Sequence, residues 1–153
     1  MKYIAELIAA AAAGGKIKLA VAAAQEVSVL EAVVDAYKAG IAEPILVGDP
    51  EAIAAAAREA NDGLGLDISG FEILPVKDLY ASAAKAVELV RTGAADILMK
   101  GIMDTSLLLK AVLNKETGIN AGHLASHVAV MEVPTYHKLL VVTDAAINIA
   151  PDL

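Results

Sequence analysis

Short apolar runs alternate with segments of helical length along this chain, and that alternation limits the possible folds more than any other feature. Strands alternating with helices of 10–15 residues are typical of βαβ units, in which neighbouring strands run parallel. The sequence therefore predicts an α/β fold, with a three-layer, mostly parallel sheet and helices on both faces. The expected strands are residues 16–24, 44–47, 71–74 and 96–99, and the expected helices are residues 28–39, 50–60, 79–92 and 105–114.

Local residues mark where several of these elements begin and end. Ser28 and Glu31 have the spacing of a capping box, in which the two side chains bond to each other's backbone amides. Asp49 precedes Pro50, a typical pair for an N-cap and a first helical position. Pro75 cannot donate to a ladder, so residues 71–74 are expected at an edge of the sheet.

The two ends of the chain differ from this pattern. Residues 127–133 and 138–142 are too close for a crossover helix, which predicts an antiparallel hairpin, with a strand that turns away from the sheet as the alternative. The second of these strands is expected to be buried and to deliver Thr143, Asp144 and Asn148 to its carboxyl end. Within residues 1–15, Tyr3, Ile4, Leu7 and Ile8 recur at helical spacing, which predicts a short amphipathic helix; a targeting segment is the alternative.

Composition excludes several classes of function. The net charge of −7 and the scattered lysines and arginines argue against a nucleic-acid partner. The chain has no cysteine, which excludes disulfides and thiolate chemistry and agrees with the reducing cytoplasm where we expect the protein. No uncharged run approaches the roughly 18 apolar residues of a membrane span, so no membrane association is expected. With 58% apolar residues and 33 alanines, the core should be aliphatic, and an exposed apolar face would mark a contact with another domain or subunit.

The first candidate site follows the strand at 96–99. Lys100 and Gly101 lie at its carboxyl end, and a helix is expected to begin at Asp104 or Thr105. Free amides and the dipole at a helix start attract phosphate or carboxylate, and a lysine adds a positive charge. The alternative is a well-capped turn with a solvated lysine. Neither a P-loop nor a dinucleotide-binding pattern occurs in the chain.

The second candidate site is the loop after the last strand. Asp144 and Asn148 offer an acceptor and an amide where a second strand end converges. The alternative is turn chemistry, because Asp and Asn commonly bond their own backbone.

Other polar residues support weaker hypotheses. Ser126 is a candidate ligand for an anion oxygen, but Ser126 and His127 point to opposite faces of a strand and cannot form a nucleophile–base pair. His123 and His127 have a helical metal-ligand spacing without a third ligand, so no metal site is predicted. Asp96 and Glu132, inside predicted strands, are expected to be salt-bridged or exposed rather than catalytic.

Residues 96–106 and 113–118 resemble the phosphate acetyl/butyryltransferase family, and residues 18–25, 42–49, 126–134 and 143–151 match it in the same order. The resemblance is strongest to phosphate butyryltransferases. It implies reversible acyl transfer between coenzyme A and inorganic phosphate, with both as substrates and no covalently bound cofactor. It also implies a two-domain fold like that of isocitrate and isopropylmalate dehydrogenases, and a homo-oligomer.

Members of that family are about twice as long as this chain. Residues 1–153 are therefore expected to correspond to the family's amino-terminal domain, without the second domain. The serine, arginine and aspartate that the family uses in catalysis belong to the later half, and no position here matches them; the catalytic residues stay unassigned. The resemblance places seven residues near phosphate or acyl phosphate: Lys100, Gly101, Asp104, Thr105, Ser126, Asp144 and Asn148.

Two hypotheses follow. The first is an incomplete half of a phosphate acyltransferase, inactive alone, that a complementary domain or chain completes. The second is a non-catalytic module that binds small anions or serves assembly, because Asn120 and His123 stand where relatives often have arginines. A nicotinamide-dependent dehydrogenase is disfavoured because the chain has no cofactor loop.

Overall fold

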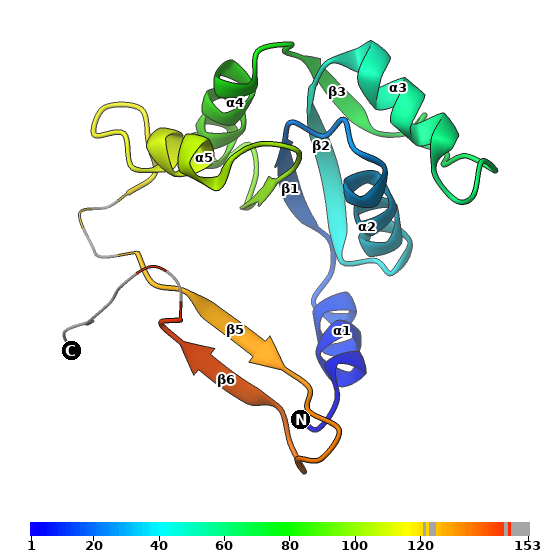
Figure 1. Ribbon diagram of the computed structural model, residues 1–153, viewed down its shortest axis with the longest axis vertical. Helices are drawn as coiled ribbons and strands as arrows, with labels where there is room; N and C mark the ends of the chain where they lie inside the picture. The colour runs from blue at the N-terminus through cyan, green and yellow to red at the C-terminus, as the bar shows by residue number, and fades with distance from the viewer. Residues whose placement is uncertain (121, 123–124, 146, 148–153) are drawn as a thin grey trace. The chain divides into compact units, whose positions relative to one another are not determined.

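The computed structural model describes the chain apart from residues 121, 123–124, 146 and 148–153. It forms two compact units (Figure 1). The larger unit comprises residues 15–120, and the smaller comprises residues 1–14 together with residues 121–153.

The larger unit is built on a four-stranded parallel sheet in the order β3-β2-β1-β4 (Figure 1). Its strands are β1 (Ile17–Ala22), β2 (Ala42–Gly48), β3 (Glu72–Pro75) and β4 (Ile97–Lys100). Pairing aligns Ala22 of β1 with Val47 of β2 and with Lys100 of β4, so these strands end at nearly the same level. β3 is an edge strand, as the proline at residue 75 predicts.

Helices cover both faces of this sheet. They are α2 (Val27–Lys38), α3 (Pro50–Glu59), α4 (Leu79–Arg91) and α5 (Thr105–Val112). Leu30 of α2 and Ile53 of α3 pack with Val21 on one face, whereas Val87 of α4 and Ala111 of α5 pack with Ala22 on the other. The prediction of a three-layer α/β fold is confirmed.

The core of the larger unit is built mainly from small and branched aliphatic side chains. Every buried apolar residue of the described chain lies between Leu19 and Ala111, and 12 of these 24 residues are alanines. Alanine loses no side-chain entropy on burial and lets helices approach a sheet closely. The high alanine content therefore allows the helices to pack close to the sheet.

One predicted helix start is wrong. α2 begins at Val27 with Glu26 at its N-cap, and no side chain caps it. Glu31 does not reach back to Ser28, because its Oε1 accepts the backbone N–H of Asn61 at 3.0 Å. A contact between segments 30 residues apart replaces the predicted capping box. By contrast, Asp49 caps α3 by accepting the N–H of Glu51 at 3.0 Å, as the sequence predicts.

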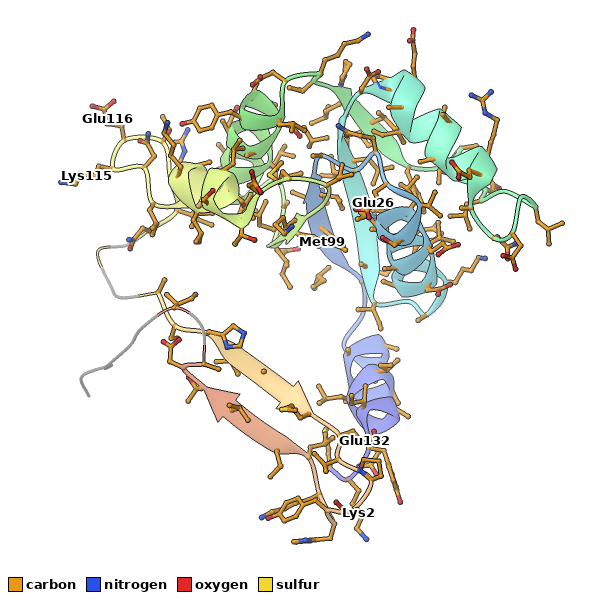
Figure 2. All side chains as sticks on the ribbon, in the orientation of Figure 1. Lys2, Glu26, Met99, Lys115, Glu116 and Glu132 are labelled. Carbon is orange, nitrogen blue, oxygen red and sulfur yellow. The ribbon has the colours of Figure 1, made fainter. Side chains whose placement is uncertain are left out.

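The smaller unit contains α1 (Ile4–Ala13) and an antiparallel hairpin of β5 (Val128–Met131) and β6 (Leu140–Thr143). The register aligns Val130 with Val141, which confirms the predicted hairpin. Figure 2 shows Glu132 beside the start of α1, where its Oε2 accepts the N–H of Ile4 at 2.7 Å. Across the chain's described part, no helix is long and apolar enough to cross a membrane.

The prediction that the last strand is buried is wrong for β6. Val141 is 67% exposed, and its partner Val130 is 41% exposed. A two-stranded ribbon has two faces, and an apolar run in the sequence does not reveal whether an element of the same chain covers them. The apolar residues of β5 and β6 therefore form an exposed surface of the smaller unit.

Candidate anion-binding site

The carboxyl ends of β1 and β4 form the point where the sheet changes direction. From β1 the chain crosses by α2 to β2 on one side, whereas β4 lies on the other side of β1. The helices that follow β1 and β4 pack on opposite faces of the sheet. In open α/β sheets, ligands bind in the crevice outside such strand ends. The first predicted group of site residues lies there.

The backbone after β4 rests directly on the backbone after β1. In this β4–α5 loop (residues 101–104), Gly101 N donates to Ala22 O at 2.7 Å, and Ile102 N donates to Ala23 O at 3.0 Å. A Cβ on Gly101 would collide with the carbonyl oxygens of Ala22 and Ala23. Glycine is therefore required for this close approach.

Lys100 helps to hold the loop closed. Its Nζ donates to Met103 O at 2.9 Å and makes a longer contact with Gly101 O at 3.4 Å. An ammonium has three donors, so these bonds keep the positive charge beside the loop without using every proton. The side chain therefore combines the local structural role with a charge at the strand end.

The start of α5 supplies polar groups next to this charge. Asp104 occupies the N-cap, as predicted, but its side chain makes no capping hydrogen bond. Thr105 begins the helix, and both it and Ser106 are exposed. The first amides of a helix lack intrahelical partners, so N–H and hydroxyl donors are available here for an oxygen-rich anion.

The second predicted group lies in the smaller unit. Asp144 Oδ1 accepts the N–H of His127 at 3.2 Å and the N–H of Ile147 at 3.2 Å. The exposed Ser126 directly precedes His127 in the chain, so the bond from His127 to Asp144 places Ser126 near the Asp144 loop. Asn148 and His123 lie outside the described residues. The two groups belong to different units.

Asp96 and Glu132 are both exposed, which is one of the two predicted outcomes, and both accept backbone amides. Asp96 Oδ2 accepts the N–H of Lys18 at 2.8 Å, and Glu132 caps the start of α1 as described above. Among the residues that the structure describes, no group of three or more His, Cys, Asp or Glu side chains is arranged to hold a metal ion.

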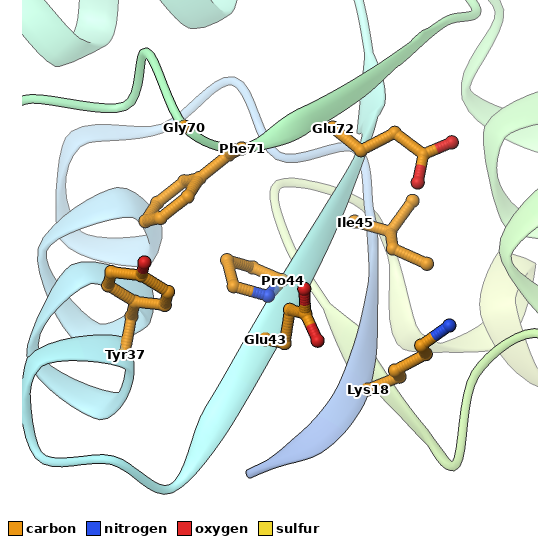
Figure 3. Close-up of a pocket in the computed structure, with 8 residues that line it drawn as sticks. All are labelled: Lys18, Tyr37, Glu43, Pro44, Ile45, Gly70, Phe71 and Glu72. Atoms are coloured by element: carbon orange, nitrogen blue, oxygen red, sulfur yellow. The ribbon is translucent and has the colours of Figure 1, made fainter.

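A separate hollow of about 150 Å³ lies at the opposite, amino end of the strands (Figure 3). Tyr37 and Phe71 meet edge to face on one side of it, with ring centroids 5.0 Å apart. Glu43 and Glu72 line it together with Lys18. With two carboxylates and one ammonium, its charge disfavours phosphate.

Ser82 is a residue near the strand ends that the sequence analysis missed. It is buried in α4, where its Oγ accepts the N–H of Ala23 at 2.8 Å and donates to Val47 O at 2.9 Å. The signal was a polar residue on the apolar face of the 79–92 helix, next to Ala83 and one turn before Ala86. Buried hydroxyls need partners, so such a residue points to a backbone contact.

Comparison with known proteins shows which family the chain resembles. The family described as Phosphate acetyl/butaryl transferase matches residues 3–82 and 75–153. The phosphate butyryltransferase of Clostridium acetobutylicum is 48% identical over 136 residues, which cover 89% of this chain and 44% of that protein. The phosphate acetyltransferase of Rhizobium meliloti is 40% identical over 147 residues, which cover 96% of this chain and 45% of that protein.

Solved structures agree. The branched-chain phosphotransacylase of Enterococcus faecalis V583 superposes with a TM-score of 0.67 at 32% identity, covering 89% of this chain and 45% of that one. The chain thus spans under half the length of the curated relatives that it matches.

Proposed function

The chain belongs to the phosphate acetyl/butaryl transferase family, and from this premise we propose that it carries the phosphate-positioning part of an acyl transfer site. The reaction is acyl-CoA plus phosphate to acyl phosphate plus coenzyme A, of the butyryl or acetyl class. A complementary domain or a second copy of the chain supplies the remaining part of the site. We propose residues 1–153 as the amino-terminal domain of the complete protein.

The observation that carries the proposal is the β4–α5 loop. A charged Lys100, a glycine that permits close backbone approach, and an α5 start without a side-chain cap are held together by hydrogen bonds. This combination fits phosphate, because charge, amides and hydroxyls all favour an anion with several oxygens. Gly101, Asp104 and Thr105 would contact or orient the anion, with Lys100 neutralising it.

In the proposed reaction, a phosphate oxygen forms a bond to the thioester carbonyl carbon. The carbon–sulfur bond then breaks, and the coenzyme A thiolate leaves with its electron pair and takes up a proton. Positioning phosphate against the carbonyl lowers the entropic part of the barrier. Donors aimed at the developing oxyanion lower the electrostatic part of the barrier. We assign no base to any of the residues that the structure describes.

We propose that Ser126, Asp144 and Asn148 bind substrate in the complete protein. Their support is the order of the sequence matches and the use of Asp144 as an acceptor for loop amides. A complementary domain, or a second copy of the chain, is the proposed partner, and no resident cofactor is part of the proposal.

The test is a phosphate titration of the 153-residue chain, in which calorimetry and ³¹P NMR measure binding. Lys100→Ala should weaken phosphate binding by roughly tenfold, since it removes a charged hydrogen-bond donor. Lys110→Ala is the matched control, because Lys110 lies in α5 with its Nζ 5.3 Å from the Tyr80 ring centroid. It should leave the phosphate affinity unchanged.

Turnover is measured separately by thiol release from butyryl-CoA in the presence of phosphate. We expect none from this chain alone and activity after a complementary half is added. Thiol release from the chain alone, lost in Lys100→Ala, would contradict the half-site proposal. Phosphate binding without turnover in the reconstituted protein would favour the non-catalytic module, and equal binding by the two lysine variants would exclude Lys100 from the site.

A further inference from the structure

We propose that Ser82 is a positioning residue that sets the shape of the β4–α5 loop from beneath the sheet. This inference rests on the proposed function, because the loop is the part of the chain assigned to phosphate. Ser82 lies in the first turns of α4 and is 1% exposed, so it does not itself meet a ligand.

Ser82 joins the carboxyl ends of two strands through one hydroxyl. Its Oγ accepts the N–H of Ala23 at 2.8 Å and donates to Val47 O at 2.9 Å. Val47 O also accepts the N–H of Ala24 at 3.2 Å. The segment after β1 is therefore fixed to the end of β2 at two successive residues.

Ala23 adopts a conformation that is uncommon for a residue with a side chain. Its φ is 52°, in the left-handed region that glycine prefers. Such a backbone persists where its surroundings hold it, and outliers of this kind gather at functional sites. The buried bond from Ala23 N to Ser82 is one of the contacts that hold it.

The next link runs from Ala23 to the anion-facing loop. Ala23 O accepts the N–H of Ile102 at 3.0 Å, and the same carbonyl leaves room only for a glycine at residue 101. The Ala23 N–H that Ser82 binds lies in the same peptide unit as Ala22 O, which accepts the N–H of Gly101 at 2.7 Å. Any turn of this peptide unit would therefore move an oxygen on which the β4–α5 loop rests. Ser82, Ala23 and Ile102 form one chain of contacts across β2, β1 and β4.

Ser82→Ala tests this series of contacts, because it removes the hydroxyl that accepts the N–H of Ala23 and donates to Val47 O. In the 153-residue protein, amide hydrogen exchange of Ile102 should rise by roughly five- to tenfold relative to that of Val33 in α2, the factor expected for a lost buried hydrogen bond. Phosphate affinity should fall by a similar factor. Ser82→Cys keeps nearly the same volume with a weaker donor, and it should shift both quantities in the same direction by less.

Thr92→Ala is the matched control. Thr92 also donates a hydroxyl to a backbone carbonyl, Glu88 O at 2.8 Å, but at the other end of α4 and on the surface. It should change exchange at Ile102 and Val33 alike and leave phosphate affinity unaltered.

Failure of this inference is distinguishable from failure of the proposed function. If neither Ser82 variant changes Ile102 exchange more than Thr92→Ala does, the positioning role is overturned whether or not phosphate binds. If the wild-type chain binds no phosphate but Ile102 exchange responds to Ser82, the proposed function is refuted and the link from Ser82 to the loop stands.

Discussion

At Gly101, the backbone of the β4–α5 loop lies so close to Ala22 and Ala23 that a Cβ atom would collide with their carbonyl oxygens. Both oxygens belong to backbone that is already hydrogen-bonded to the loop, so neither can move cheaply. We therefore expect Gly101→Ala to lower the free energy of unfolding by about 1–3 kcal/mol, as overpacking does, and to weaken phosphate binding.

Gly70→Ala is the control at this scale, because a Cβ there would meet nothing within 4 Å. Its free energy of unfolding should stay within about 1 kcal/mol of the wild type, or rise slightly. Urea unfolding followed by circular dichroism measures both variants. Equal stability of the two alanine variants would show that the loop does not rest on Ala22 and Ala23 as described.

At the scale of elements, two aspartates occupy the same helical position with different contacts. Asp78 caps α4, and its Oδ1 accepts the N–H of Ala81 at 2.7 Å. Asp104 occupies the N-cap of α5 without such a bond. Asp78→Ala should therefore cost about 1 kcal/mol of stability, and Asp104→Ala should cost clearly less. Urea unfolding of both variants tests this, and a larger loss for Asp104→Ala would contradict it.

Local pattern was sufficient to predict most elements and the position of the first candidate loop. Asp49 and Pro50 start α3 because an N-cap depends on neighbouring residues only, and the short link between β5 and β6 permits only an antiparallel turn. The Ser28–Glu31 box failed because Glu31 instead binds Asn61, a partner that the fold supplies. Ser82 was missed for the same reason: its two partners lie on β2 and after β1.

At the scale of the whole molecule, burial is divided unevenly between the two units. Residues 15–120 contain every buried residue of the described chain, whereas no described residue of residues 1–14 or 121–153 is buried. The smaller unit exposes Val128, Val130 and Val141 on one face of its hairpin. Since a two-stranded hairpin alone is at best marginally stable in water, the stability of the chain should reside in the larger unit.

We therefore expect residues 15–120, produced alone, to fold and to unfold cooperatively in urea. The free energy of unfolding should lie within about 1–2 kcal/mol of that of the 153-residue chain, because the buried apolar area is retained. Amide exchange should be slow in β1 and β2 of both chains and fast in β5 and β6 of the longer one. Two results would contradict this prediction: unfolded residues 15–120, or amide protection in β5 and β6 equal to that in β1. Either result would mean that the smaller unit stabilises the core, although Val141 of β6 is exposed. The β4–α5 loop and Ser82 both lie within residues 15–120, so phosphate titration of the shorter chain completes the test. A phosphate affinity equal to that of the 153-residue chain would assign phosphate binding to the larger unit alone.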